Sequence, residues 1–186
     1  MQNICNEFAI NIVGGDISQA AQVVIDVSML GVVEKENLCL RRGAKAGDII
    51  FVTGQLGGSI FGRHLSFTPR LKEARYLVKN VKVNSMIDIS DGLTQDLGHI
   101  LRASSVGAVL YEGLIPISKH SRSLNDALFM GEDFELLFTV SPKAANRLLK
   151  KKVFRPIGEI TQDPGLRLID KRSRERPITP KGYAHF

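Results

Sequence analysis

Three short turns of this sequence join acidic side chains to glycine: Gly14-Gly15-Asp16, Asp88-Ile89-Ser90-Asp91-Gly92 and Gly131-Glu132-Asp133. Glycine lets the backbone approach a ligand closely, and a carboxylate in such a turn is presented rather than packed. In the middle turn, Asp88 and Asp91 follow an apolar strand and precede a helix, whose first N–H groups attract anions. Carboxylate and phosphate oxygens are the ligands that Mg²⁺ takes in proteins. The middle turn is therefore a candidate magnesium and phosphate site.

A structural interpretation of the same turn stays open. On that interpretation Ser90 or Asp91 only caps the following helix, and Asp-Gly is only a turn dipeptide. A substitution that lowers the melting temperature together with ligand binding would support the cap.

The other chemical signals are weaker. The loop Arg41-Arg42-Gly43-Ala44-Lys45 either places an arginine against phosphate or is an ordinary basic surface loop. The glycine-rich residues 54–59 lack the Gly-Lys-Ser/Thr ending of a P-loop. No two of the four histidines stand at metal-ligand spacing, and there is no Gly-x-Ser-x-Gly elbow and no Cys/His pairing. We therefore assign no catalytic nucleophile or base.

The middle turn needs a strand before it and a helix after it, and the sequence supplies both. Residues 85–87 lead into Asp88 as a strand, and Leu93, Leu97 and Leu101 mark one face of the following helix. Other strands are expected at residues 23–29, 49–53, 109–111, 134–140, 153–160 and 166–169. Other helices are expected at residues 57–65, 69–79 with Thr68 as N-cap, and 143–152 after Ser141-Pro142. Strands and helices in no strict βαβ rhythm predict an α/β (α+β) fold, a mixed sheet with packed helices.

Composition narrows the class of protein. A chain of 186 residues with 44% hydrophobic and 24% charged residues can hold a globular core. Cys5 and Cys39 are too few for a disulfide framework, so a reducing cytoplasm is expected. No apolar stretch is long enough to span a membrane, and the amino terminus lacks the pattern of a signal peptide. The net charge is +6, but the cations are dispersed without aromatic residues between them, which favours a solvated surface over nucleic-acid binding. A small phosphorylated ligand fits the same charge balance equally well.

Taken in order, these motifs resemble the thiamine-monophosphate kinase family, whose superfamily includes aminoimidazole ribonucleotide synthetase and selenophosphate synthetase. The resemblance covers almost the whole chain, and its motifs are specific in this order and spacing. They are Val13-Gly14-Gly15-Asp16, Leu40-Arg41-Arg42-Gly43-Ala44-Lys45-Ala46-Gly47-Asp48, Val52-Thr53-Gly54, Arg63-His64-Leu65, Thr68-Pro69-Arg70, Ile87-Asp88-Ile89-Ser90-Asp91-Gly92-Leu93, Asp96-Leu97-Gly98-His99-Ile100-Leu101, Gly131-Glu132-Asp133-Phe134-Glu135-Leu136-Leu137-Phe138, Ile157-Gly158-Glu159-Ile160 and Lys181-Gly182-Tyr183-Ala184-His185-Phe186.

The resemblance implies a fold, an activity and a set of site residues. The fold would be the carboxy-terminal domain of the aminoimidazole ribonucleotide synthetase-like fold. The activity would be transfer of the ATP γ-phosphoryl group to thiamine monophosphate, giving thiamine diphosphate, with several Mg²⁺ ions. By position, the residues that contact ATP would be Gly15, Asp16, Arg41 and Ser90, those that bind magnesium Asp16, Asp88 and Asp91, and those that face the thiamine substrate Glu132 and Tyr183.

The sequence departs from the family in two places. The family's amino-terminal half, with its Gly-Asp-Asp-Ala turn and further aspartates, is not matched, and Ile17-Ser18 stands where threonines are usual. Residues 1–34 are thus expected to be a remnant of the amino-terminal ATP-binding domain, and residues 35–186 the carboxy-terminal α/β domain. A homo-oligomer, or association with a chain supplying the missing half, is expected, with weak turnover by this chain alone. Two alternatives stay open: another ATP-dependent member of the superfamily, and a non-catalytic fragment that binds a ligand or a partner.

Overall fold

A computed structural model describes residues 1–183, so the last three residues of the Lys181–Phe186 motif, His185 among them, lie outside the described part. The chain forms two compact units, Met1–Val32 and Val33–Phe186. The first unit holds one helix, α1 (Gln2–Glu7).

Residues 23–29 of the first unit, where the sequence predicts a strand, form no strand, and Val23, Ile25 and Met29 are exposed. The prediction of a strand there is wrong, because no segment among the described residues offers its backbone a ladder partner.

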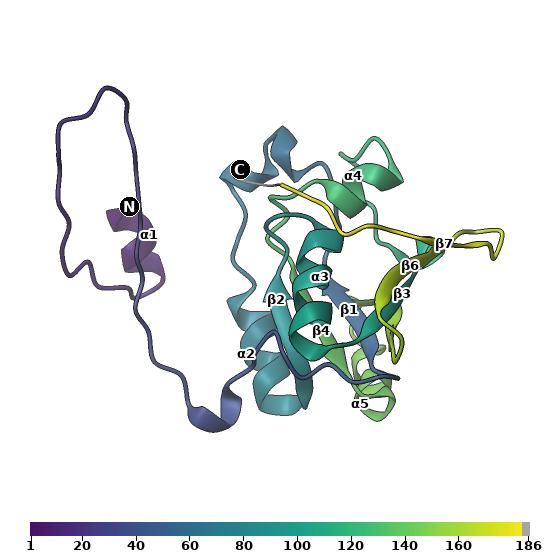
Figure 1. Ribbon diagram of the computed structural model, residues 1–186. Helices are drawn as coiled ribbons and strands as arrows, with labels where there is room; N and C mark the ends of the chain where they lie inside the picture. The colour runs from purple at the N-terminus through teal and green to yellow at the C-terminus, as the bar shows by residue number, and fades with distance from the viewer. Residues whose placement is uncertain (184–186) are drawn as a thin grey trace. The chain divides into compact units, whose positions relative to one another are not determined.

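The second unit is built on one seven-stranded sheet (Figure 1). The strand order is β2-β4-β1-β5-β3-β6-β7, and only the pairing of β3 with β6 is parallel. The mixed sheet expected from the sequence is therefore confirmed. The strands are β1 (Ile49–Thr53), β2 (Val83–Asp88), β3 (Gly107–Tyr111), β4 (Leu136–Val140), β5 (Phe154–Thr161), β6 (Gly165–Ile169) and β7 (Glu175–Pro177).

Helices cover both faces of this sheet, because side chains of the central strands alternate between two cores. Ile50 and Val52 of β1 join the core that contains α3 (Leu93–Ser104) and α4 (Leu124–Phe129). Phe51 of β1 joins the second core, with α2 (Leu71–Asn80) and α5 (Pro142–Leu148). In Figure 1, α3 crosses one face of the sheet, and β2 is the strand at one edge. Short 3₁₀ turns complete the unit: Lys35–Asn37, Ser59–Phe61, Arg63–Leu65 and Glu112–Leu114.

Several element boundaries differ from the sequence predictions. The expected helix at residues 57–65 is two 3₁₀ turns, because Gly62 between them has φ 137°. Helix α2 begins at Leu71 with Arg70 at the N-cap, so Thr68 is not its cap. The cap at Ser141 is confirmed, because its hydroxyl accepts a hydrogen bond from the Ala144 N–H. No helix among the described residues has both the length and the apolar character needed to cross a membrane.

Candidate functional site

Backbone hydrogen bonds join the acidic turn at residues 88–92 to the turn at residues 131–135, here called the Glu132 turn. Ser90 O accepts from the Glu132 N–H at 2.8 Å, and Ile89 O accepts from the Phe134 N–H at 2.8 Å. Any side chain at Gly131 would collide with Ser90 O, so glycine is required for this approach. Two motifs some forty residues apart therefore lie side by side.

The end of the described chain reaches the same place. The Tyr183 N–H donates to Asp91 O at 2.9 Å, and the Thr94 hydroxyl donates to Lys181 O at 2.8 Å. A side chain at Gly182 would meet Asp91 O. Tyr183, expected on the substrate side, is therefore close to the residues 88–92 turn, with its side chain 61% exposed.

One carboxylate, that of Asp96, holds the backbone of the residues 88–92 turn. Its Oδ2 accepts the N–H groups of Ser90, Asp91 and Gly92 at 3.1, 3.0 and 3.1 Å, and the residue is 1% exposed. Burial raises the pKa of Asp96 to about 6, against the lowering effect of these hydrogen bonds. Gly92 is the N-cap residue of α3, and no side chain among residues 1–183 caps the helix. The interpretation of Ser90 or Asp91 as a helix cap is therefore wrong.

The three polar side chains of the turn are left without protein partners. Among residues 1–183, the side chains of Asp88, Ser90 and Asp91 make no hydrogen bond or ion pair. Asp88 is exposed, and Ser90 and Asp91 are half-buried. Ligand atoms of Asp91, Asp96 and His99 lie within 4.8 Å of one another. Asp88 is not part of this group. Asp96 Oδ2 holds three N–H groups, so the carboxylate oxygens that remain for a hard cation are those of Asp91, Oδ1 of Asp96 and, outside the group, those of Asp88.

Arg41 lies next to the end of β2. Leu40 O accepts the Met86 N–H at 3.0 Å, so the chain carrying Arg41 runs along this edge strand. Arg41 and Asp88 line the same surface hollow of about 640 Å³. Burial and the charges of Arg102 and Arg41 lower the pKa of His99 on α3. The structure thus brings Arg41 to the acidic turn, where a cation can meet phosphate.

Two residues of the Glu132 turn have left-handed backbone conformations. Glu132 has φ 67° and Phe134 has φ 49°, a region that costs non-glycine residues energy. The half-buried Glu132 side chain makes no hydrogen bond or ion pair among residues 1–183. The turn conformation therefore presents a carboxylate that stabilises nothing within the described protein.

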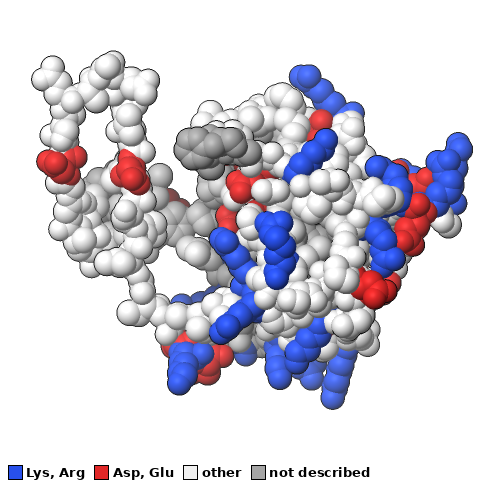
Figure 2. Space-filling view, in the orientation of Figure 1, with Lys and Arg blue, Asp and Glu red and all other residues white. Residues whose placement is uncertain are grey.

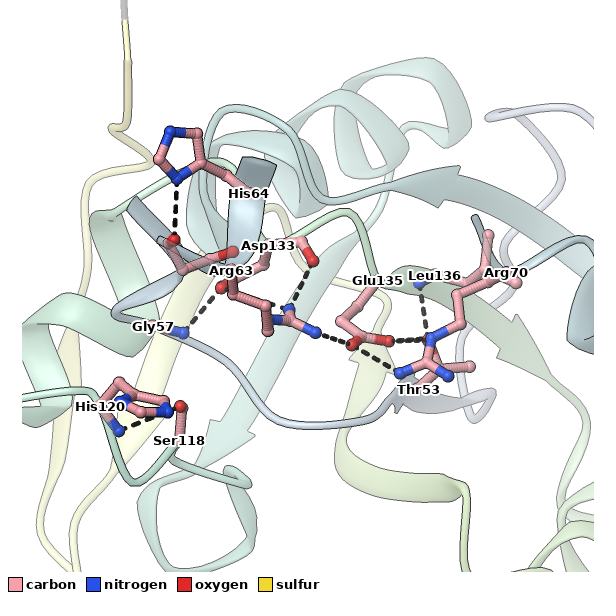
Figure 3. Close-up of polar contacts among 11 residues, drawn as sticks. Thr53, Gly57, Arg63, His64, Arg70, Ser118, His120, Asp133, Glu135 and Leu136 are labelled. Carbon is pink, nitrogen blue, oxygen red and sulfur yellow. Dashed lines mark hydrogen bonds and ion pairs between the residues drawn. The ribbon is translucent and has the colours of Figure 1, made fainter. Parts of the chain in front are cut away.

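A buried ionic cluster supports the Glu132 turn (Figure 3). The carboxylate of Glu135, 1% exposed, accepts from Arg63 at 3.0 Å, from Arg70 at 2.7 and 2.8 Å, and from the Thr53 hydroxyl at 2.6 Å. We call these four residues the Glu135 cluster. These residues lie in motifs that carry the family resemblance, but the motifs alone predict no role for them.

Asp133 extends this support to the glycine-rich loop before α2. Its Oδ2 accepts the Gly57 N–H at 2.8 Å, and its backbone carbonyl accepts from Arg63 at 2.6 Å (Figure 3). Burial raises the pKa of Asp133 to about 7, and its buried Oδ1 has no hydrogen-bond partner within the described part of the chain. Asp133 thus fixes the position of its neighbour Glu132 from inside the protein.

Gly15 and Asp16 belong to the first unit. There, Asp16 Oδ1 accepts the Ile17 N–H at 2.9 Å, and both residues are exposed. Their expected contacts with ATP and magnesium remain predictions.

Comparison with known proteins places this geometry in a family. Residues 45–171 match the family model described as AIR synthase related protein, C-terminal domain. A thiamine-monophosphate kinase from Buchnera aphidicola subsp. Schizaphis graminum is 38% identical over 98% of this chain and 66% of its own length. The corresponding protein of Bacillus subtilis is 31% identical over the whole chain and 67% of its own length.

Solved structures agree with these matches. The thiamine-monophosphate kinase from Stenotrophomonas maltophilia K279a aligns with a TM-score of 0.64 and 26% identity, over 73% of this chain and 54% of that one. The structure described as AaThiL complexed with AMPPCP and TMP aligns with a TM-score of 0.60 and 28% identity, over 78% of this chain and 53% of that one. Escherichia coli HypE, at 20% identity and a TM-score of 0.66, shares the fold. The chain therefore belongs to the AIR synthase related family and, within it, to the thiamine-monophosphate kinase family.

Proposed function

We propose that this protein takes part in transfer of the γ-phosphoryl group of ATP to thiamine monophosphate, giving thiamine diphosphate. The observation that supports this most is the contrast within the residues 88–92 turn. Asp96 holds its backbone, while Asp88, Ser90 and Asp91 keep side chains that no described residue uses. Similarity to thiamine-monophosphate kinases and to a structure with AMPPCP and TMP supports the choice of substrates.

Each residue of the site has a role in this proposal. Arg41 and Ser90 contact ATP phosphates, while Glu132 and Tyr183 face the thiamine substrate. Phosphoryl transfer depends mainly on positioning and charge neutralisation, so no protein nucleophile is required. Gly15 and Asp16 add contacts to the nucleotide in the complete site.

The carboxylates of the turn fit magnesium. Asp88 and Asp91 offer hard oxygens without competing hydrogen bonds among residues 1–183, which is the donor type that Mg²⁺ takes. These two residues would hold magnesium, and Asp16 of the first unit is proposed separately as a magnesium ligand. Bound magnesium neutralises phosphate charge during transfer.

The chain spans 66% of the length of the Buchnera relative and 54% of the Stenotrophomonas structure. We propose that residues 1–34 correspond to the end of the relatives' amino-terminal ATP-binding domain, and residues 35–186 to the carboxy-terminal domain. The complete site would then include groups from the part of the relatives' length that these 186 residues do not match. A homo-oligomer, or association with a chain that supplies those groups, is part of this proposal. Turnover by this 186-residue chain alone is expected to be barely above background.

The test of the site is Asp91→Asn in the full 186-residue chain, with calorimetric binding of AMPPCP in the presence of Mg²⁺. Losing one charged ligand should weaken binding by about tenfold, which corresponds to about 1.4 kcal/mol. The melting temperature should stay near that of the wild type, because the Asp91 side chain has no structural partner among residues 1–183.

Asp163→Asn is the matched control, since Asp163 is an exposed aspartate in the turn between β5 and β6. Equal losses of binding in the two variants would refute the site. A melting temperature that falls with binding only in Asp91→Asn would instead assign Asp91 a structural role.

A further inference from the structure

The last residue of α3 holds the loop that carries Arg41. The Ser104 hydroxyl accepts the N–H groups of Gly43 and Ala44 at 3.1 and 3.2 Å, across sixty residues of sequence. Ala44 is 5% exposed and joins the core that contains α3. One hydroxyl therefore satisfies two consecutive backbone donors two and three residues after Arg41.

The part of the loop that follows Ala44 is held by hydrogen bonds to Asp48. The carboxylate of Asp48, 3% exposed, accepts the Lys45 N–H at 3.0 Å and the Asn84 side-chain amide at 2.8 and 2.9 Å. Gly43 has φ 119°, and a side chain there would collide with Asn84 O. The loop backbone thus has one conformation that fits against β2 and α3.

Arg41 lies between two anchor points. Before it, Leu40 O is bonded to the Met86 N–H, and after it Gly43 and Ala44 are bonded to Ser104. The Arg41 side chain itself makes no hydrogen bond or ion pair among residues 1–183. The backbone on either side therefore fixes the point from which the Arg41 side chain extends.

We propose that Ser104 is a positioning residue that sets Arg41 relative to the residues 88–92 turn. Helix α3 makes both connections: Asp96 in its first turn holds the acidic turn, and Ser104 at its end holds the Arg41 loop. The helix thus fixes the spacing of the two elements proposed to meet the nucleotide phosphates. Without that anchor, a ligand must order the loop as it binds, which costs affinity. This inference rests on the role proposed above for Arg41.

The experiment is a double-mutant cycle in the full chain, with AMPPCP and Mg²⁺ as the probe. Ser104→Ala should weaken binding by about three- to tenfold, the range expected for one or two lost hydrogen bonds. In an Arg41→Ala background the same substitution should have almost no further effect, because its consequence passes through Arg41. Ser104→Thr, which keeps the hydroxyl, should restore binding. Ser66→Ala removes an exposed hydroxyl that makes no hydrogen bond among residues 1–183 and is the control.

Amide hydrogen exchange separates this inference from the proposed function. The Gly43 and Ala44 amides should exchange faster in Ser104→Ala than in the wild type or Ser104→Thr, whether or not nucleotide binds. Unchanged exchange would refute the anchor. Faster exchange with a binding loss that persists in the Arg41→Ala background would refute positioning through Arg41. Normal AMPPCP binding by Arg41→Ala alone would refute the role of Arg41, while the exchange data would still decide whether Ser104 holds the loop.

Discussion

Two groups of charged side chains meet at the Glu132 turn, and their partners differ. In the Glu135 cluster, both oxygens of Glu135 are taken by Arg63, Arg70 and Thr53. On the acidic turn, Asp88 and Asp91 have no side-chain partner within residues 1–183. The difference separates two uses of charge: a carboxylate that is fully paired stabilises the fold, and one left unpaired beside a cation such as Arg41 is available to a ligand.

Basic side chains on the surface of the second unit form a further group of charges, distinct from the two groups above. In the space-filling view, acidic atoms appear near the middle of the second unit with basic side chains beside them, and basic side chains also line its lower rim (Figure 2). Helices α2 and α5 carry exposed cations, among them Lys72, Lys79 and Arg147, which we interpret as part of a solvated face.

The largest expected effect is on stability, from Glu135→Gln. Removing the charge leaves Arg63 and Arg70 without their buried counterion, and both are only about one-third exposed or less. Breaking a buried pair in this way costs about 3 kcal/mol. Denaturant unfolding should show this loss, with Glu73→Gln as a control that removes only the more exposed partner of Arg70. A loss equal to that of the control would overturn the structural role of the cluster.

The next effect is a pH dependence of stability due to Asp133. Its folded pKa is raised by burial to about 7, well above the unfolded value, so the folded protein holds a proton that the unfolded chain has released. Stability should therefore fall as pH rises from about 4 towards 7, by about 1.4 kcal/mol per pH unit for a single group. Asp96, with a pKa raised by burial to about 6, acts in the same direction.

Asp133→Asn isolates the contribution of Asp133. The difference in unfolding free energy between pH 5 and pH 6.5 should shrink by about 2 kcal/mol relative to the wild type. An unchanged slope would mean that Asp133 is ionised in the folded protein throughout this range.

A smaller effect is expected from Glu132→Gln, which tests the ligand-facing side of the comparison. Loss of this charge should weaken binding of thiamine monophosphate by about tenfold and binding of AMPPCP by less, without a change in unfolding free energy beyond about 0.5 kcal/mol. Calorimetry with both ligands checks the ratio, and Glu36→Gln in an exposed 3₁₀ turn serves as the control. Equal losses for the two ligands would contradict the assignment of Glu132 to the thiamine side.

The sequence predicted the elements that carry the site better than the contacts that hold it. The strand before Asp88 and the helix after Gly92 are confirmed, because their apolar periodicity is local and strong. The hydrogen bonds from three N–H groups to Asp96 have a local signal, a carboxylate in the first turn of a helix whose N-cap residue is glycine, and they were missed. The bonds from Arg63 and Arg70 to Glu135 span 72 and 65 residues, so only the folded sheet brings them together.

The turn conformations explain another part of the difference. An apolar run from Phe134 onward predicted a strand from that residue, but β4 begins at Leu136 because Phe134 is left-handed. That conformation follows from the hydrogen bond of the Phe134 N–H to Ile89 O, a contact with a different turn. Periodicity reports which side chains are buried and carries no information about such backbone contacts.

The smallest expected effect is from Ser90→Ala. This substitution tests whether an uncharged side chain of the acidic turn also serves the ligand rather than the fold. If the hydroxyl touches ATP, its removal should weaken AMPPCP binding by about threefold, the value of one modest hydrogen bond. Stability should not change, because the hydrogen bond from the Ser90 backbone N–H to Asp96 is kept in this variant.

Asp96→Ala provides the contrast, since it should lower both binding and stability by releasing three N–H groups of the turn. Calorimetry and denaturant unfolding on the two variants separate the side chain that faces the ligand from the one that holds the turn. A stability loss in Ser90→Ala comparable to that of Asp96→Ala would mean that the two residues hold the turn together, and the division between structural and ligand-facing groups would then fail at this position.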